Sequence, residues 1–416
     1  MRILIGTSSL PPAAGVGTYV HNLAIWMSLS NHEVLVCRSS PVQKGNIISY
    51  PYKIIDIPVP EKMKDEHTAL FRLYEVVNEF SPEAIINNDN IYLSNLLPYL
   101  SPEIVRISVV HGYRGMGLSW DEHLIIFNAA LLNYQYVDHI IAISTPMKEA
   151  ILKKLGCSTG QVKLVFNGSF GDNRENKKSQ YPHKPIQIVF GGGNNWTKGA
   201  DVVLCAARKM SHMKIGDYQI NWIGHLAERG KYSKKHLDTV RNVRAFGYIP
   251  SDKLQVMLAE ADILVMPSRA EGCPMLLLEA MSKGMVIIVS DCPSAMKEIV
   301  IAANAGFVIS AGSSKELLDA LIELIESNTK RKVMSENAVD FYNKNLTMDC
   351  SGAKIEELCR KRCASRNAKK EDFPPQCFIP YHRRPYAKGS LFKLTSVKQR
   401  IRITFGWLPP RRHINI

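Results

Sequence analysis

The chain has 416 residues, of which 46% are hydrophobic and 22% are charged, as in a globular protein rather than a fibrous or disordered one. This length suits two α/β domains with a cleft between them, plus an appendage. No stretch approaches the ~20 apolar residues that span a bilayer, which excludes a transmembrane helix, and the N-terminus lacks the pattern of a secretion signal. We therefore expect a cytoplasmic protein.

The cysteines indicate the redox compartment of the protein, and the charges indicate its binding partners. Nine cysteines are scattered and odd in number, which favours free thiols in a reducing compartment. The net charge of +14 is concentrated at one end, since residues 351–416 hold 16 Lys or Arg and 4 Asp or Glu. Such a basic tail predicts peripheral contact with an anionic membrane surface, with a solvated extension as the alternative. Nucleic-acid binding is not expected.

Short β-like runs alternate with helical patterns from the first residue, which predicts a parallel sheet with crossover helices. The expected strands are 2–6, 33–37, 84–87, 106–110, 139–143 and 162–166. Helices such as 18–28 and 145–155 separate them. Residues 1–170 are therefore expected to form one Rossmann-like domain.

A polar stretch without apolar periodicity, residues 171–185, predicts an interdomain linker. The alternation then restarts, with strands at 186–190, 218–223, 263–266, 286–290 and 306–309 and helices at 201–210, 251–261, 275–282 and 314–327. Residues 186–345 are therefore expected to form a second Rossmann-like domain. Stretches 331–345 and 350–363 also have helical patterns, and Pro and basic residues beyond Lys370 predict irregular structure.

Two glycine-containing loops follow predicted strands, at the sheet edge where ligands bind in open parallel sheets. Gly15-Val16-Gly17 opens a helix and presents backbone N–H groups to an anion, although a plain tight turn explains it nearly as well. Gly191-Gly192-Gly193 precedes Lys198 at another helix start, which indicates phosphate binding, with an exposed surface lysine as the alternative. No Gly-Lys-Ser/Thr follows, which disfavours a nucleoside triphosphate hydrolase.

The most informative feature is a pair of glutamates at a strand end and in the following helix. Glu271 is expected to face the cleft where that helix begins, and Glu279 lies just over a turn inside it. Carboxylates accept hydrogen bonds from vicinal diols, so one could bind sugar hydroxyls and the other a ribose. Glu279 follows an apolar run and would be costly to bury without such a partner.

These motifs resemble those of the retaining glycosyltransferases of the GT-B fold, family GT4 (glycosyl transferases group 1), over roughly residues 1–365. Glu271 and Glu279 match the family's Glu-x7-Glu motif in its usual context. Three other segments resemble the N-terminal glycine loop, the segment entering the linker and the loop beside the donor base, namely Gly15-Val16-Gly17, Val165-Phe166-Asn167-Gly168 and Phe246-Gly247-Tyr248-Ile249. The resemblance implies an α/β protein with two Rossmann-like domains facing across a cleft.

The resemblance also implies roles for particular residues. His111 would lie against the donor sugar, Glu271 would contact the transferred sugar, and Lys198 would bind the donor pyrophosphate; these three are the expected catalytic residues. Glu279 would bind the ribose, and Gly17 would face the distal phosphate. The expected donor-binding residues are Gly15, Gly17, Gly193, Asn194, Lys198, Tyr248, Ile249, Gly272, Cys273, Pro274, Met275, Leu276 and Glu279. The family's last helix typically crosses back to the N-terminal half, which residues 346–365 would do before the tail at 366–416.

One departure concerns the pyrophosphate site. The family usually has an arginine a few residues before the lysine, whereas this chain has Asn194 and Asn195 there. Arg269 or Arg114 is the expected replacement for the missing charge.

No cofactor or metal is expected, since Asp-x-Asp and His-Glu-x-x-His are both absent from the sequence. Charge on the leaving group would then be met by Lys198, helix N-termini and backbone donors. Cys359 and Cys363, near Cys350 and Cys377, have no standard zinc spacing.

The leading hypothesis is a transferase that moves a hexose from a UDP-, GDP- or ADP-sugar to a carbohydrate or lipid-linked acceptor. The product would belong to a surface polysaccharide, lipopolysaccharide or glycolipid, and the acceptor would meet the N-terminal half. A sugar-nucleotide epimerase of the same architecture and a non-catalytic scaffold subunit are the alternatives. Turnover of a panel of sugar nucleotides separates the three.

Overall fold

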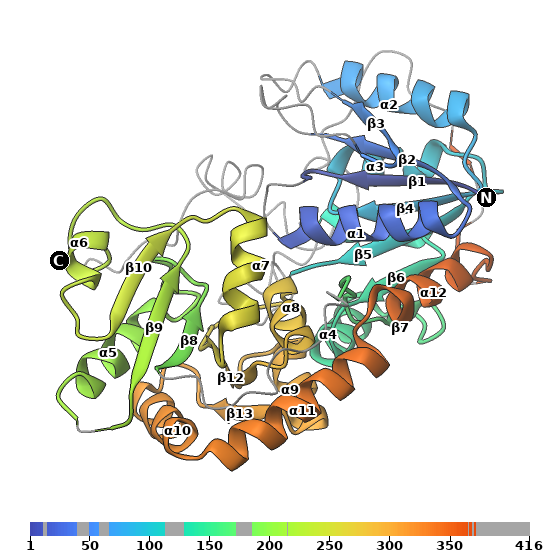
Figure 1. Ribbon diagram of the computed structural model, residues 1–416. Helices are drawn as coiled ribbons and strands as arrows, with labels where there is room; N and C mark the ends of the chain where they lie inside the picture. Colours follow the sequence, from blue (N-terminus) through green and yellow to red (C-terminus); the bar gives the residue numbers. More distant parts are fainter. Residues whose placement is uncertain are drawn as a thin grey trace, which may run out of the picture.

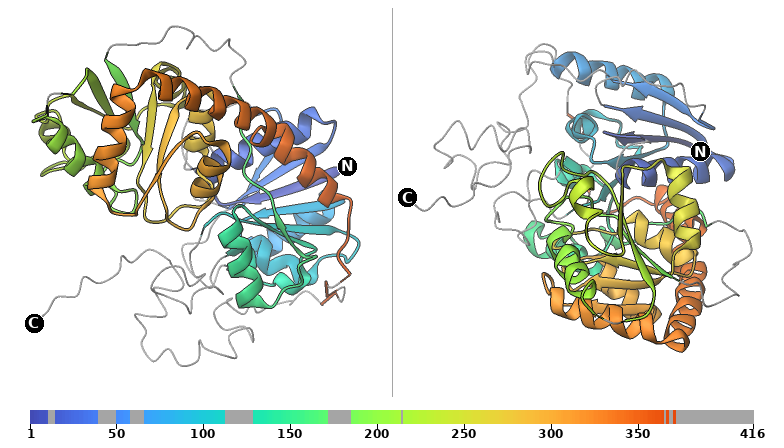
Figure 2. Two further views of the ribbon diagram at one scale, coloured as in Figure 1. Left: turned by 90° about the horizontal axis from the view of Figure 1, so that it is seen from below. Right: turned by 60° about the vertical axis from the view of Figure 1, so that its left-hand side comes forward.

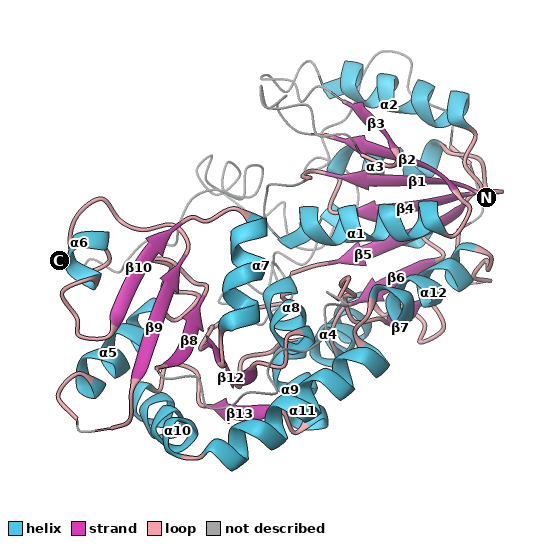
Figure 3. Cartoon of the chain, viewed as in Figure 1, coloured by secondary structure: helices cyan, strands magenta, loops and turns pink. Residues whose placement is uncertain are grey.

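The computed structural model describes residues 1–10, 15–39, 50–57, 66–112, 129–171, 185–213, 215–364, 366–367 and 370–371. These residues form two lobes, each built on one parallel sheet with helices on both faces (Figure 1). Figure 3 shows the same alternation of strands and helices in both lobes. The prediction of two parallel α/β domains is confirmed.

The N-terminal lobe contains a seven-stranded sheet of order β3-β2-β1-β4-β5-β6-β7. Its strands are β1 Arg2–Thr7, β2 Glu33–Arg38, β3 Lys53–Asp56, β4 Ala84–Asn88, β5 Val105–Val110, β6 His139–Ala142 and β7 Val162–Leu164. Its helices are α1 Gly15–Leu29, α2 Glu66–Phe80, α3 Ile91–Leu96 and α4 Thr145–Leu155. The strand order reverses between β1 and β4, which creates a crevice at the carboxyl ends of these strands.

The C-terminal lobe contains a six-stranded sheet of order β10-β9-β8-β11-β12-β13. Its strands are β8 Ile186–Phe190, β9 Tyr218–Ile223, β10 Val243–Gly247, β11 Ile263–Met266, β12 Val286–Ser290 and β13 Gly306–Ile309. Its helices are α5 Ala200–Met210, α6 Lys234–Leu237, α7 Ser251–Glu260, α8 Met275–Ser282, α9 Ala295–Ala303, α10 Ser314–Glu326 and α11 Asn328–Asn345.

The predicted strands lie within two residues of the observed ones, but several elements were missed. Edge strands β3 and β10 are short and partly exposed, so they lack a continuous apolar run. In β10 the pairing with β9 shifts register between Ala245 and Gly247, where the sequence favoured a loop. Helices α2, α3, α6 and α9 were also not predicted.

The chain crosses between the lobes twice, and the two crossings touch. The first passes through Ser169, which forms a parallel bridge with Thr347 in the second. Helix α12 Met348–Cys359 then packs on α1, with Trp26 Nε1 donating to Asp349 Oδ1 at 2.7 Å. A Cβ added to Gly352 would lie 2.4 Å from the Trp26 ring, so only glycine allows this approach. Figure 2 shows α11 and α12 running along both lobes.

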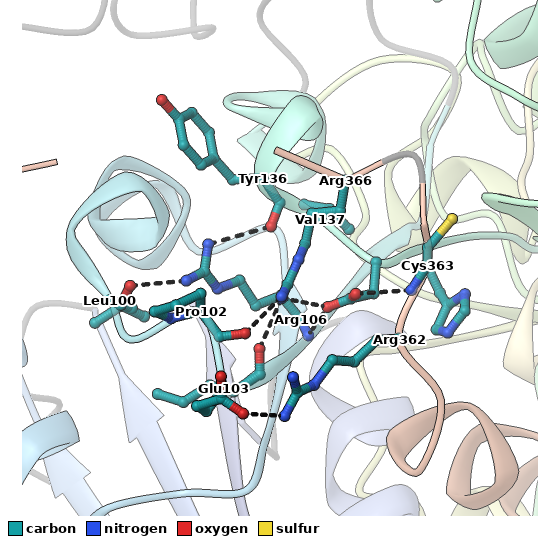
Figure 4. A network of polar contacts seen from close by, with 12 residues as sticks. Leu100, Pro102, Glu103, Arg106, Tyr136, Val137, Arg362, Cys363 and Arg366 are labelled. Carbon is teal, nitrogen blue, oxygen red and sulfur yellow. Dashed lines mark hydrogen bonds and ion pairs between the residues drawn. The ribbon is translucent and has the colours of Figure 1, made fainter. Parts of the chain in front are cut away.

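Beyond α12 the chain is fastened to the N-terminal lobe by a buried polar network (Figure 4). Asp138 is fully buried, and its Oδ2 accepts from Arg366 Nη1 at 2.7 Å and from the backbone N of Arg106 at 2.8 Å. Its Oδ1 accepts from the backbone N of Cys363 at 2.9 Å. Arg106 donates to three backbone carbonyls, and burial lowers its pKa to about 10, with Arg366 adding repulsion. This network holds the last described residues on the lobe.

Candidate functional site

A cavity of about 430 Å³ lies between the lobes, at the carboxyl ends of strands from both sheets. Ten of the predicted site residues line it, namely Gly15, His111, Lys198, Glu271, Gly272, Cys273, Pro274, Met275, Leu276 and Glu279. They come from four separate segments of the chain, so only the fold brings them together. The volume falls within the range of small-ligand sites.

An ion pair occupies one wall of this cavity. Lys198 Nζ lies 2.5 Å from Glu271 Oε1, and Ser268 Oγ donates to the same oxygen at 3.0 Å. The Glu271 side chain is 8% exposed and that of Lys198 is 39% exposed, so the ammonium group borders the open space. An anion that binds in the cavity would therefore contact a lysine that is already paired with a carboxylate.

The loop that carries Lys198 is held rigidly. Gly199 has φ of 79° at the start of α5, and a Cβ there would lie 2.2 Å from the carbonyl oxygen of Pro267. Gly193 has φ of 56° and packs equally closely on His225. Both positions require glycine, because the conformation and the space exclude a side chain. Two glycines of this glycine-rich segment are therefore required by the conformation and packing of the loop.

Arg269 does not reach the cavity. Its guanidinium group donates to both carboxylate oxygens of Asp201, at 2.8 and 2.7 Å, and stacks on Trp196 at 4.2 Å. Arg269 was expected to face the pyrophosphate, but in the structure it pairs with Asp201. Arg114, the other expected arginine, lies outside the described residues. Arg269 instead braces the loop, since its Nη1 also donates to the carbonyl oxygen of Trp196 at 2.7 Å.

Glu279 lies on α8, which begins at Met275 directly after Pro274. Although part of its side chain borders the cavity, burial raises the pKa of Glu279 to about 7, while a hydrogen bond from Gln255 and the charge of Lys283 lower it. A carboxyl group that titrates near neutrality can lose its proton when a ligand binds and then accept hydrogen bonds from the hydroxyl groups of the ligand.

Titration of Glu279 predicts a pH dependence of stability. The folded state keeps a proton up to about pH 7, whereas the unfolded carboxyl group loses it near pH 4.5. The free energy of unfolding should therefore fall as pH rises through this window, by about 3 kcal/mol from this group. Denaturant unfolding at several pH values should show that Glu279→Gln removes this slope.

The exposed Glu260 at the end of α7 provides the control, since Glu260→Gln should keep the wild-type slope. Identical pH curves for wild type and Glu279→Gln would contradict the assignment.

His111 lies one residue beyond β5 and is enclosed on several sides. Its Nε2 lies 2.9 Å from Asn88 Oδ1, and the ring of Tyr19 meets it edge to face at 4.8 Å. Burial lowers the pKa of His111 to about 3. The imidazole is therefore neutral near pH 7, which suits a hydrogen-bonding role better than proton transfer.

The lobes touch directly beside this histidine. A Cβ on Gly272 would lie 2.5 Å from the carbonyl oxygen of His111, so a side chain there would push the lobes apart. Asn167 Nδ2 donates to the carbonyl oxygen of Cys273 at 2.7 Å, and Glu298 Oε1 accepts from the backbone N of Thr145 at 2.9 Å. Gly272, Cys273 and Asn167 also line the cavity, so the contact between the lobes forms part of its wall.

Five predicted donor-binding residues do not line the cavity. They are Gly17, Gly193, Asn194, Tyr248 and Ile249. Gly17 is buried against the Leu10 backbone, the backbone N of Asn194 donates to His225 at 2.8 Å, and Tyr248 is 68% exposed. Gly17, Gly193 and Asn194 lie within two residues of lining residues, so closeness in sequence does not by itself place a residue in the cavity wall. Their roles stay predictions.

Sequence reasoning also missed residues that line the cavity. It did not single out Thr18, Ile143, Phe190, Ile223, Leu254, Val265, Met266 and Ser268. It recognised the motifs that contain Val16, Asn167, Gly191 and Gly192 without naming these four as donor-binding residues. Ser268 immediately precedes the glutamate motif, and Thr18 follows the glycine loop, so proximity to a motif was a usable signal. Leu254 and Ile143 carry no local signal, because they enter through packing of the lobes.

The remaining expectations concern the cysteines, metal ions and membrane-spanning helices in the described part of the chain. Eight of the nine cysteines are free, and Cys377 lies outside the described residues. Burial in α12 raises the pKa of Cys359 to about 12, unlike that of a zinc-ligating thiol. Within the described ranges, no cluster of three or more His, Cys, Asp or Glu is placed to hold a metal ion. No described helix is long and apolar enough to cross a bilayer.

Family comparisons divide the chain into the same two halves. Residues 13–169 match the family model described as Glycosyltransferase Family 4, and residues 171–341 match the one described as Glycosyl transferases group 1. WcaL of Escherichia coli (strain K12), named as a colanic acid biosynthesis glycosyltransferase, is 25% identical over 185 residues, or 43% of this chain and 45% of that protein. The chain spans about half the length of the curated relatives it matches.

Solved structures share the fold over most of the described chain. Sucrose-phosphate synthase (tll1590) from Thermosynechococcus elongatus has a TM-score of 0.69 at 17% identity, covering 86% of this chain and 98% of that one. Alr3699/HepE from Anabaena in complex with UDP-glucose has a TM-score of 0.66 at 16% identity, covering 86% and 99%. The expected arrangement of two Rossmann-like domains across a cleft is confirmed.

Proposed function

The chain belongs to the family 4 glycosyltransferases (glycosyl transferases group 1) and has their GT-B fold, and from this premise we propose that it transfers a hexose from a nucleotide diphosphate sugar, with retention at the anomeric carbon. The observation that carries the proposal is the convergence of Lys198, Glu271, Glu279 and His111 on one cavity. A basic group, two carboxyl groups and a neutral imidazole match the diphosphate and hydroxyl groups of such a donor.

The proposed chemistry relies on positioning and electrostatics. Charge on the departing diphosphate would be stabilised by Lys198 and by the N-terminal end of α5, which begins two residues later. His111 would act as a neutral hydrogen-bonding group, consistent with its lowered pKa. The acceptor hydroxyl would attack the anomeric carbon from the face that the diphosphate leaves. The bond between that carbon and the diphosphate oxygen would break, and the hydroxyl proton would pass to the departing diphosphate.

The proposed acceptor belongs to a surface polysaccharide, lipopolysaccharide or glycolipid. The name of the relative WcaL, from colanic acid biosynthesis, supports this class. Because the Anabaena neighbour was solved with UDP-glucose, this is the first donor to test.

The test is incubation of the chain with UDP-, GDP- and ADP-sugars. Release of nucleoside diphosphate, slow with water and faster with acceptor, would support transfer. Interconversion of the sugars would indicate an epimerase, and binding without turnover would indicate a scaffold. The last two outcomes would each overturn the proposal.

The reaction is expected to be independent of metal ions. Excess EDTA should change the rate of donor turnover by less than about twofold, because the charges proposed to act on the diphosphate come from Lys198 and a helix terminus. The measurement is nucleoside diphosphate release with and without EDTA. Loss of turnover that Mn²⁺ or Mg²⁺ restores would contradict this expectation.

We also propose that the basic tail binds an anionic membrane surface. Residues 372–416 hold nine Lys or Arg and one Asp. The full chain should therefore bind vesicles containing anionic lipid, and added salt should weaken binding, since each basic residue near such a surface contributes about 1 kcal/mol.

A chain ending at Glu371 should lose most of this binding and keep donor turnover. This end point retains Arg366 in its buried network and the hydrogen bond from Glu371 N to the carbonyl oxygen of Pro98, at 2.9 Å. Vesicle sedimentation measures both chains. Equal binding would return the tail to the solvated-extension interpretation.

A further inference from the structure

Asn88, the last residue of β4, holds the ring of His111. Its Oδ1 lies 2.9 Å from His111 Nε2. Strands β4 and β5 are neighbours with Asn88 in register with Val109, so both side chains leave the same edge of the sheet. An amide oxygen only accepts hydrogen bonds, so this contact places the ring hydrogen of His111 on Nε2 and leaves Nδ1 with a lone pair.

The lone pair of Nδ1 is available to a ligand. Among the described residues, Nδ1 has no hydrogen-bond partner, and His111 lines the cavity between the lobes. The edge-to-face contact with Tyr19 limits rotation of the ring. A neutral imidazole fixed at one nitrogen thus presents the other as an acceptor.

A contribution to folding stability does not explain why asparagine occupies position 88. Asn88 is fully buried, and its Nδ2 has no partner in the part of the chain that the structure describes. An unpaired buried donor costs about 1–3 kcal/mol. The neighbouring Asn87 is different, since its Nδ2 donates to Ser94 Oγ at 2.6 Å and its Oδ1 accepts from Asn90 N at 3.0 Å. The contact with His111 is therefore the feature that distinguishes Asn88.

The titratable and charged groups near the imidazole do not determine which ring nitrogen carries the hydrogen, so this depends on Asn88. Tyr19 on α1 and Cys273 before α8 are titratable, and burial raises the pKa of both, so both are neutral near pH 7. The charges of the same cavity are those of Lys198 and Glu271, which pair with each other, and of Glu279. Burial is the cause of the lowered pKa of His111.

We propose that Asn88 is a positioning residue that holds His111 as the Nε2–H tautomer, so that Nδ1 accepts a hydrogen bond from a hydroxyl group of the ligand in the cavity. The identity of that ligand as a sugar nucleotide rests on the proposed function, whereas the tautomer does not. Asn88 itself touches no substrate in this scheme.

The tautomer can be measured directly in the full chain. With ¹⁵N-labelled histidine, NMR distinguishes protonated from unprotonated ring nitrogens, and His111→Gln identifies the His111 signals by their loss. We expect Nε2 protonated and Nδ1 unprotonated between pH 5.5 and 8. His139 is an internal reference, because its Nε2 lies 2.7 Å from the carbonyl oxygen of Lys361 and has the same state. Protonation of His111 on Nδ1 alone would overturn the inference.

Asn88→Asp tests the consequence for the ligand. A carboxylate at this position raises the pKa of His111, so that the ring becomes protonated on both nitrogens as pH falls and Nδ1 can no longer accept. Because a neighbouring carboxylate can raise the pKa of His111 from about 3 to about 5–6, the test extends to pH 5. With UDP-glucose, or the sugar nucleotide that turns over fastest, the ratio of kcat/KM for Asn88→Asp to that for wild type should fall about two- to tenfold from pH 8 to pH 5. For Asn87→Asp, one residue earlier, this ratio should stay constant.

The two proposals fail in different ways. If wild type turns over no sugar nucleotide, the proposed function fails, while the His111 spectrum still supports or overturns the tautomer. If wild type is active and Asn88→Asp has a constant ratio, the positioning role is overturned. The tautomer measurement on the wild type does not depend on the Asn88 variant, so it still supports or overturns the inference if Asn88→Asp folds poorly.

Discussion

Replacing Lys198 with glutamine is expected to lower kcat/KM for donor turnover by about a hundredfold, the typical effect of removing one group that stabilises transition-state charge. Glutamine can keep a hydrogen bond to Glu271, whose Oε1 lies 2.5 Å from Nζ, but it removes the positive charge that faces the cavity. The effect should appear in kcat, because charge develops on the diphosphate as its bond to the sugar breaks. Steady-state kinetics of nucleoside diphosphate release measures it.

The matched control is Lys209→Gln, at the exposed far end of the helix that follows Lys198. This change should leave turnover unchanged, and both variants should keep their free energy of unfolding within about 1 kcal/mol of wild type. Wild-type kinetics for Lys198→Gln would remove Lys198 from the proposed site, whatever nucleotide the chain uses.

Replacing Arg366 with methionine is expected to lower the free energy of unfolding by about 3 kcal/mol, because it leaves the fully buried Asp138 without its ionic partner. Two backbone donors, from Arg106 and Cys363, still reach Asp138, and the repulsion between Arg106 and Arg366 disappears, which keeps the effect near the lower end of the usual range. For a chain of 416 residues, the melting temperature should fall by roughly 3–4 °C.

Arg362→Met is the control for this network. Arg362 lies only four residues before Arg366 and pairs with Glu103. Both side chains of this pair are at least half exposed, so the loss should stay below about 1 kcal/mol. Adding Asp138→Asn to Arg366→Met should recover part of the stability, since the unpaired charge is then gone. Equal thermal shifts for the two arginine variants would show that the buried pair does not anchor the chain end.

Much of the fold could be predicted from the sequence, because apolar runs and turn residues are patterns of a few consecutive residues. Central strands such as β1, β5, β8 and β12 are nearly continuous apolar runs, as strands buried on both faces must be, and the turns between them contain Gly and Pro. Glu271 and Lys198 were found for the same reason, because each lies between the end of a strand and the start of a helix, and Glu279 was found by its spacing from Glu271. The edge strands β3 and β10 were missed because one side of each is open to solvent, which weakens the apolar pattern.

The tertiary structure alone decided which of these local features meet. Arg269 stands two residues from Glu271 yet pairs with Asp201, and Tyr248 belongs to a matching motif yet is 68% exposed and does not line the cavity. Asn88 and His111 touch because β4 and β5 are neighbours, and Arg366 reaches Asp138 because the chain returns to the first lobe after α12. Periodicity, glycine spacing and helix starts depend on a few consecutive residues and can be read along the chain. The partner of a polar side chain depends on the order of strands and the docking of lobes, which are set by the packing of the whole chain.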